Sequence, residues 1–261
     1  VAIGDYVLYI DSDDYIDVNM IDILIKKSKE TNSDTVYCGL TRVSADETET
    51  PVPLVYDNKL FTGREIITDI LLEMVGSKPQ DKDDTNLSVW HAIYSMDIIR
   101  KHNIRFPSER QVMCEDIMYH INYLRYAERV SCIKDCLYYY RVNPKSLSQI
   151  YDAKRFERQK VLSRAIIDAL DEFVDPTDYL IREQRRLLGG ARMQIQAIAA
   201  SKEQNKIELI DRICSDEYIE EILKYYPYKK NPIKHKIFNY CMKNRKNLML
   251  LVLCKLFAII R

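Results

Sequence analysis

The segment VLYIDSDDYI constrains the fold more than any other stretch, because an apolar run passes directly into a cluster of acids. Val7 to Ile10 has the continuous apolar and aromatic character of a short buried strand. Asp11, Asp13 and Asp14 follow it within four positions. Carboxylates this close repel one another and are costly at a strand end unless a positive charge lies beside them. The segment therefore predicts a cation site at the end of a strand.

The pair Asp11 and Asp13 is the first candidate for metal binding. A strand followed by Asp-x-Asp places two carboxylates in a tight turn at the edge where open α/β sheets bind ligands. Mg²⁺ and Mn²⁺ prefer oxygen ligands and complete their shells with phosphate oxygens and water. The alternative is that the acids only complement the dipole of the following helix. One aspartate would be enough for that purpose.

Size and charge narrow the classes of function. The 261 residues allow one large domain or a domain with an appendage, and 39 basic side chains balance 39 acidic ones. This neutral balance argues against a dedicated nucleic-acid-binding protein, so no nucleic acid is expected as a partner. Seven cysteines without a CxxC pair predict buried free thiols in a reducing cytoplasm. Cytoplasmic localisation is therefore expected.

The apolar pattern changes near residue 150, where we place a domain boundary. Residues 151–261 are helical in pattern, and Gly189-Gly190 is expected to interrupt a long helix. The part before the boundary mixes strands and helices, so the fold class is α/β followed by a mostly helical region. Strands are expected at 7–10, 35–40 and 130–140, helices near 20–27, from 62 and over 115–127, and loops at 41–60, 76–86 and 106–114. Because the chain lacks an initiator Met and begins at a strand, we expect its N-terminal part to be missing.

Two further groups of residues are candidates for chemistry. Glu115 and Asp116 stand at the start of a predicted helix, where a carboxylate is able to act as a general base at a pocket edge. The alternative is again a helix-dipole complement. Arg141 and Lys145 follow the aromatic strand LYYY and are candidates for facing a diphosphate, or else are solvated cations at a strand end.

Four segments, in order, resemble the second half of a family 2 glycosyltransferase of the GT-A fold. They are VLYIDSDDYID, SVWHAIYSMDIIRKHNIRFPSE, CEDIMYHINYLRYAERV and CLYYYRVNPKSLSQ. The resemblance covers residues 1–150, and order and spacing together are more specific than any one motif. It implies a partial, N-terminally truncated GT-A (nucleotide-diphospho-sugar transferase) domain that carries the metal and acceptor side. Such bacterial enzymes typically add a sugar to a capsule, exopolysaccharide or lipopolysaccharide chain.

The resemblance implies a role for each matching acidic residue. Asp13 would ligate the Mg²⁺ or Mn²⁺ that bridges the donor diphosphate, with Asp11 helping through the ribose or the metal shell. Asp116 would be the catalytic base of an inverting transfer from a nucleotide-sugar to a saccharide or lipid-linked acceptor. Glu115 would orient that acceptor.

Trp90 and His91 are the residues that the resemblance places near the acceptor. The family often has Trp-Asn-Lys-Leu-Tyr where this chain has WHAIY, so the usual lysine is absent. Because the strands that hold the nucleotide base in this family would precede Val1, the chain alone is expected to bind a donor poorly and to be inactive.

Two rival functions remain open from the sequence. A haloacid-dehalogenase-like phosphatase also places Asp-x-Asp after an apolar strand, but it requires Thr or Val where Tyr15 stands. Its acidic pair normally follows an apolar strand, whereas Glu115 follows a polar segment. The other rival is a non-catalytic degenerate scaffold, against which the presence of Asp11, Asp13 and Asp116 argues.

The C-terminal segment suggests a membrane surface. A lysine-rich stretch over 229–246 leads into the apolar run 248–260, which contains Lys255. Thirteen residues are too few to span a bilayer, which takes about 20. A basic segment beside an apolar helix is able to lie at an anionic interface, so peripheral binding to the inner membrane is expected. The alternative is a helix packed on the protein core.

Overall fold

The computed structural model describes residues 2–56, 58–81, 87–108, 113–142 and 151–259. It divides into two compact units. The first holds residues 1–74 and 84–144, and the second holds residues 75–83 and 145–261. The second unit therefore begins close to the boundary predicted near 150, but it also takes in a short segment that the sequence assigned to the first part.

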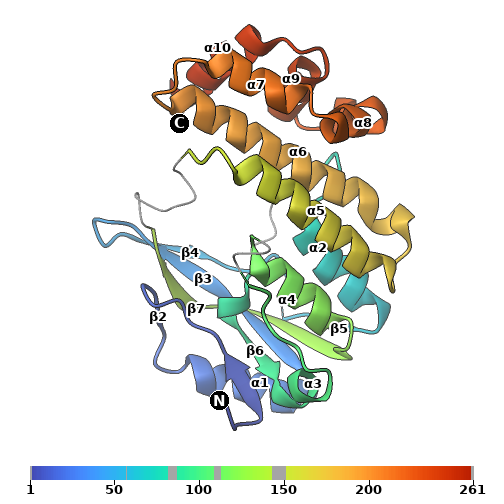
Figure 1. Ribbon diagram of the computed structural model, residues 1–261. Helices are drawn as coiled ribbons and strands as arrows, with labels where there is room; N and C mark the ends of the chain where they lie inside the picture. The colour runs from blue at the N-terminus through green and yellow to red at the C-terminus, as the bar shows by residue number, and fades with distance from the viewer. Residues whose placement is uncertain (1, 57, 82–86, 109–112, 143–150, 260–261) are drawn as a thin grey trace. The chain divides into compact units, whose positions relative to one another are not determined.

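The first unit is built on a seven-stranded sheet with the order β1-β6-β3-β7-β2, to which β4 adds beside β3 and β5 beside β7. Figure 1 shows the long strands β3 and β7 side by side. They are parallel, whereas the other strand pairs among the described residues are antiparallel. The strands are β1 (Tyr6–Leu8), β2 (Tyr15–Ile16), β3 (Thr35–Val43), β4 (Glu49–Val52), β5 (Leu60–Thr62), β6 (Ala92–Ser95) and β7 (Arg129–Arg141).

Helices cover this sheet because β3 alternates between two apolar faces. Val36, Cys38 and Leu40 pack with Met20 and Leu24 of α1. On the other face, Tyr123 of α4 bonds to Thr35. The helical elements of this unit are α1 (Met20–Thr31), η1 (Ile66–Leu71), α2 (Leu72–Val75), η2 (Val89–His91), α3 (Met96–Lys101) and α4 (Glu115–Leu124), with α2 reaching the first residue of the second unit.

Two local predictions for this unit differ from the structure, and a third is confirmed. The strand near Val7 is half-buried rather than buried, because it lies at the edge of the described sheet with β6 as its partner. Residues 41–60 contain the short strand β4, where Pro51 is tolerated because that strand is also at an edge. The helix expected from residue 62 does form there, because Arg64 and Glu65 are helical and the Glu65 carboxylate accepts the Thr62 N–H at 3.3 Å, and it continues into the π-helical element η1 at Ile66.

The cysteines are all free, as predicted, and five of them are buried. Cys136 is half-buried, and Cys114 is exposed. The prediction of burial is wrong for Cys114 because this residue lies in the loop before α4, with a left-handed backbone (φ 57°).

The second unit is helical. In Figure 1, α5 and α6 run alongside each other. Its helical elements are α5 (Arg155–Asp171), α6 (Pro176–Ala200), α7 (Lys206–Cys214), α8 (Glu217–Tyr225), η4 (Tyr228–Lys230), α9 (Ile233–Lys243) and α10 (Asn247–Ile259). Their apolar faces share one core that includes Leu187, Ile195, Ile210, Phe238 and Leu250.

The expected break at Gly189-Gly190 does not occur, because α6 continues through both glycines. A Cβ at Gly190 would lie 2.9 Å from Cδ of Gln159 on α5. Glycine at this position lets the two helices approach closely. Its role is packing between helices rather than termination of one.

Candidate functional site

The acidic turn after β1 is held in shape by Asp14. The Asp14 N–H donates to the Asp11 carbonyl at 3.1 Å, which closes a four-residue turn. The carboxylate of Asp14 accepts from the Tyr138 hydroxyl at 2.8 Å and from the Arg141 N–H at 2.9 Å. One of the three clustered acids therefore has a structural partner on β7. This explains how its charge is accommodated beside the other two.

Asp11 and Asp13 are both exposed in this turn. Partial desolvation raises the pKa of Asp11, and the charges of Asp14 and Asp13 raise it further. A cation would relieve this repulsion. The acids do not cap α1, because that helix begins at Met20 and β2 intervenes. The helix-dipole alternative therefore fails for the turn.

The carboxylates of Asp11 and Asp13 are suitable ligands for a loosely held hard cation. Within the described part of the chain, no group of three or more His, Cys, Asp or Glu side chains is placed to hold a metal. Two exposed carboxylates are nevertheless what Mg²⁺ uses when substrate phosphates and water supply the remaining ligands. The roles of Asp11 and Asp13 as ligands stay predictions.

Trp90 packs against aromatic residues of β7, and one of these, Tyr138, also contacts the acidic turn. Its ring centroid is 4.3 Å from that of Tyr138 and 5.8 Å from that of Tyr140, with the latter ring nearly parallel at 11°. Trp90 is half-buried, so part of its ring remains accessible. An aromatic face of this kind is able to pack against a sugar ring. Its assignment to the acceptor stays a prediction.

His91 is wholly buried, and its two ring nitrogens are both occupied. Nδ1 donates to the Cys38 carbonyl, and Nε2 accepts the Ser88 N–H at 2.7 Å. Burial lowers the pKa of His91 to about 4, so the ring is neutral. In this arrangement His91 supports the segment that carries Trp90, and no ring nitrogen is left to contact an acceptor directly.

Asp116 and Glu115 form the first turn of α4 and are both half-buried. Asp116 is four residues before His120 and seven before Tyr123, so the three lie on one face of the helix. His120 is fully buried and bonds through Nε2 to the Tyr94 hydroxyl at 3.1 Å. The helix is thus anchored by its later residues, and its N-terminal turn presents the acids. The roles of base and orienting residue stay predictions.

The two predicted cations have different outcomes. Arg141 ends β7, and its guanidinium carbon lies 5.1 Å from the centre of the Tyr15 ring. Tyr15 in turn stacks on Tyr139 at 4.6 Å. The cation is therefore next to the acidic turn, although a contact with a diphosphate stays a prediction. Lys145 lies outside the described residues.

Sequence reasoning missed the two residues that order the site, Asp14 and Tyr138. Nothing in the sequence separates Asp14 from its acidic neighbours. In the sequence, Tyr138 is one member of an alternating aromatic strand. The available signal was the run of three tyrosines before Arg141, because a hydroxyl on a buried strand residue needs a partner.

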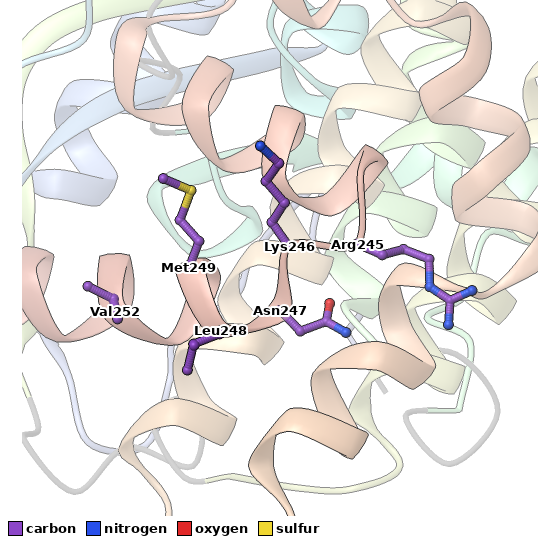
Figure 2. Close-up of a pocket in the computed structure, with 6 residues that line it drawn as sticks. All are labelled: Arg245, Lys246, Asn247, Leu248, Met249 and Val252. Atoms are coloured by element: carbon purple, nitrogen blue, oxygen red, sulfur yellow. The ribbon is translucent and has the colours of Figure 1, made fainter.

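In the second unit, an open pocket of about 590 Å³ lies at the start of α10. Figure 2 shows Arg245 and Lys246 at the turn before the helix and Leu248, Met249 and Val252 along it. Arg245 is paired with Asp211 at 2.6 Å. The Nζ atom of Lys246 lies 5.0 Å from the centre of the Tyr240 ring. The pocket is therefore apolar along one side and basic at one end.

The fold is that of the GT-A glycosyltransferases, as predicted. A crystal structure of residues 1–349 of S. aureus TarS in complex with UDP-GlcNAc matches this chain with a TM-score of 0.57 and 13% identity. That match covers 98% of this chain and 68% of TarS 1–349. A second TarS 1–349 structure matches with a TM-score of 0.54 and 13% identity, covering 100% of this chain and 68% of that one.

Sequence relatives carry the glycosyltransferase name. "Uncharacterized glycosyltransferase EpsJ" of Bacillus subtilis (strain 168) is 28% identical over 149 residues, which are 57% of this chain and 41% of EpsJ. "Cholesterol galactosyltransferase" of Borreliella burgdorferi is 27% identical over 139 residues, 52% of this chain and 37% of that protein. The chain thus spans about two fifths of these relatives. No protein-family model matches.

The predicted resemblance to bacterial glycosyltransferases is confirmed by these relatives and by the fold. The phosphatase alternative receives no support from them. Across the described residues, no helix is long and apolar enough to cross a membrane.

Proposed function

We propose that this chain is the metal and acceptor side of an inverting glycosyltransferase that acts in cell-surface polysaccharide synthesis. It would move a sugar from a nucleotide-sugar donor to a saccharide or lipid-linked acceptor. The observation that carries the proposal is the acidic turn, where Asp14 is bonded to β7 while Asp11 and Asp13 remain exposed. Support also comes from TarS, which shares the fold and has been crystallised with UDP-GlcNAc.

Asp11 and Asp13 would hold a Mg²⁺ or Mn²⁺ ion, with Asp13 as the main ligand. That ion would supply charge neutralisation to the leaving diphosphate, an effect worth several kcal/mol. The chain's own contribution is to present two carboxylates on a rigid turn. The carboxylate of the third acid, Asp14, is already hydrogen-bonded to the Tyr138 hydroxyl and the Arg141 N–H.

Asp116 would act as the base. Its carboxylate would accept the proton of an acceptor hydroxyl while that oxygen forms a bond to the anomeric carbon. The bond between that carbon and the phosphate oxygen breaks, and its electron pair leaves with the nucleoside diphosphate. Glu115 would hold the acceptor, and the partly exposed ring of Trp90 would pack against it.

The experiment is a donor screen on the intact native protein that carries this chain. Nucleoside diphosphate release is measured with UDP-sugars and other nucleotide-sugars, with Mn²⁺, with Mg²⁺ and after chelation. We expect release that requires an acceptor and a divalent cation and inverts the anomeric centre. Phosphate release from p-nitrophenyl phosphate without sugar transfer would contradict the proposal.

We further propose that the second unit binds the cytoplasmic face of an anionic membrane. On α10, Leu248, Val252 and Leu256 are exposed at four-residue intervals, and Leu248 is 64% exposed. Ile233 and Ile237 form a similar exposed pair on α9. Large exposed apolar patches mark interaction surfaces. Exposed lysines lie on the same two helices and on the turn between them: Lys234, Lys236, Lys243, Lys246 and Lys255.

The mixture of exposed apolar and cationic side chains favours a lipid surface over a second copy of the chain. Apolar side chains would enter the boundary between headgroups and acyl chains, and lysines would remain at the phosphates. Lys246 is suited to this, because its contacts are with Tyr240 rather than with an acid. Such binding would bring the enzyme to a lipid-linked acceptor.

A further inference from the structure

We propose that Tyr138 is a positioning residue that holds the Asp11–Asp13 turn in the shape that the donor's cation requires. The inference rests on the proposed function and deepens it. The hydroxyl of Tyr138 contacts both ends of the turn at once. It accepts the N–H of Asp11 at 3.1 Å and donates to Oδ2 of Asp14 at 2.8 Å.

These contacts form a closed circuit. The Asp14 N–H returns to the Asp11 carbonyl at 3.1 Å, so Asp11, Asp14 and Tyr138 are linked pairwise. The second oxygen of Asp14 is held by the Arg141 N–H, also on β7. Three hydrogen bonds thus fix a short turn to a thirteen-residue strand, and a fourth closes the turn itself. A turn with this many contacts has little freedom to move Asp11 and Asp13 apart.

Burial makes the hydroxyl hard to replace. The Tyr138 side chain is fully buried, so water would not easily take over its two hydrogen bonds. Loss of one partner in such a network leaves the remaining polar groups unsatisfied. Here the group left behind would be the half-buried carboxylate of Asp14. Its charge would then face Asp11 and Asp13 without a hydroxyl donor.

The ring and the hydroxyl of Tyr138 have separable tasks. The ring packs 4.3 Å from Trp90, on the side predicted for the acceptor. The hydroxyl contacts only the acidic turn among the described residues. Tyr138→Phe therefore removes the turn contacts and keeps the ring contacts. It should weaken cation and donor binding while the acceptor KM stays unchanged.

The test compares Tyr138→Phe with Tyr179→Phe in the intact protein. Tyr179 is a matched control in the second unit, since its ring is buried and its hydroxyl donates to Asp171 Oδ1 at 2.5 Å. Binding of Mn²⁺ in the presence of UDP is followed by the electron paramagnetic resonance of the free ion, with a UDP reference lacking protein. We expect Tyr138→Phe to weaken this binding about tenfold, the usual effect of losing a residue that orients a ligand. Tyr179→Phe should leave it unchanged.

A second variant keeps the test decisive if Tyr138→Phe fails to fold. Asp14→Ala removes the other half of the contact and should weaken Mn²⁺ binding similarly. In the double variant the loss of Mn²⁺ affinity should be smaller than the sum of the two single losses, because the two residues share the Tyr138–Asp14 hydrogen bond. Unchanged Mn²⁺ binding in Tyr138→Phe, or in Asp14→Ala where the first does not fold, would overturn the inference. Asp13→Asn separates the two proposals, because a fully retained Mn²⁺ affinity there would refute the metal site itself.

Discussion

The hydroxyl of Tyr123 on α4 accepts a hydrogen bond from Oγ1 of Thr35 on β3 at 2.9 Å. It also accepts the Ser95 N–H at 2.9 Å and donates to the Asp34 carbonyl at 3.1 Å. This three-way contact fixes the register of α4 on the sheet. Asp116 lies two turns before Tyr123 on the same face, so its position depends on this anchor.

The anchor predicts opposite effects for two buried tyrosines of the first unit. Tyr123→Phe removes the acceptor of the buried Thr35 hydroxyl and one of the two acceptors of the Ser95 N–H, which keeps its bond to the Asp34 carbonyl. It should lower the free energy of unfolding by about 1–3 kcal/mol. The Tyr37 hydroxyl, by contrast, is buried without a hydrogen-bond partner among the described residues. Tyr37→Phe should therefore leave stability unchanged or raise it by up to about 1 kcal/mol.

Urea unfolding followed by the fluorescence of Trp90, the single tryptophan, measures both variants within the first unit. A loss of stability in Tyr37→Phe equal to that in Tyr123→Phe would contradict the account of the two hydroxyls.

The acids of the proposed site predict separable kinetic losses. Asp116→Asn should lower kcat by about 10²–10⁴-fold, the usual contribution of a base, with donor affinity nearly intact. Asp13→Asn should instead lose metal-dependent donor binding, because it removes the main ligand. Steady-state kinetics and titration with the nucleotide distinguish the two.

Asp22→Asn is the control for a helix-dipole role. Asp22 is exposed in the first turn of α1, just as Asp116 stands in the first turn of α4. Both substitutions remove a similar interaction with a helix N-terminus, worth about 0.3–1 kcal/mol. If Asp116→Asn kept wild-type turnover, Asp116 would be only a complement to the helix dipole, as Asp22 is.

The two buried histidines predict a pH dependence of stability. Burial lowers the pKa of His91 to about 4 and that of His120 to about 3, and the charge of His91 adds to the effect on His120. In the unfolded chain both titrate near 6.5, so the unfolded state binds more protons below that pH. Their contribution is complete above about pH 6.5 and is lost progressively toward pH 3, by at most about 1.4 kcal/mol per pH unit for each.

Proton NMR of the imidazole groups between pH 8 and 5, combined with urea unfolding, checks this expectation. The signals of His91 and His120 should not titrate in that range, and stability at pH 5 should be below that at pH 7. An ordinary titration of either ring near pH 6.5 would show that it is not held neutral by burial.

Much of the first unit could be predicted because its signals are local. The strand at Thr35 and the helix at Glu115 are marked by apolar periodicity and by acids at the helix start, and both form where expected. The acidic turn could be located for the same reason. The resemblance to glycosyltransferases depends on the order of such segments, and the sequence relatives and the fold agree with it.

The interior of the site was not predictable, because it depends on contacts between distant residues. Asp14 and Tyr138 are separated by 124 positions, and no periodicity relates them. His91 was expected near the acceptor, yet its ring faces Cys38, 53 positions away, inside the core. Pairings of this kind are decided by strand register, which the sequence specifies only through the whole set of cross-strand contacts.

The exposed apolar stripe on α10, formed by Leu248, Val252 and Leu256, predicts which surface of the second unit binds a membrane. The double substitution Leu248→Glu and Val252→Glu places charges where acyl chains would lie. It should abolish flotation of the protein with vesicles that contain anionic lipid. Lys246→Gln should weaken flotation more modestly, by about 1 kcal/mol or roughly fivefold, and the difference should shrink at high salt. Leu180→Glu, on the exposed side of α6, is the control for adding charge to an apolar surface position.

Flotation is measured with phosphatidylglycerol vesicles and with neutral phosphatidylcholine vesicles, alongside sedimentation of the free protein. Binding to the anionic vesicles alone is the expected result, because the lysines near the stripe are attracted by a net negative surface charge, which the zwitterionic phosphatidylcholine lacks. Should the Leu248 and Val252 double variant float as well as the wild type, α10 would not be the lipid-binding element. If the wild type formed a stable dimer and the double variant were monomeric, the stripe would instead be a contact between copies of the chain.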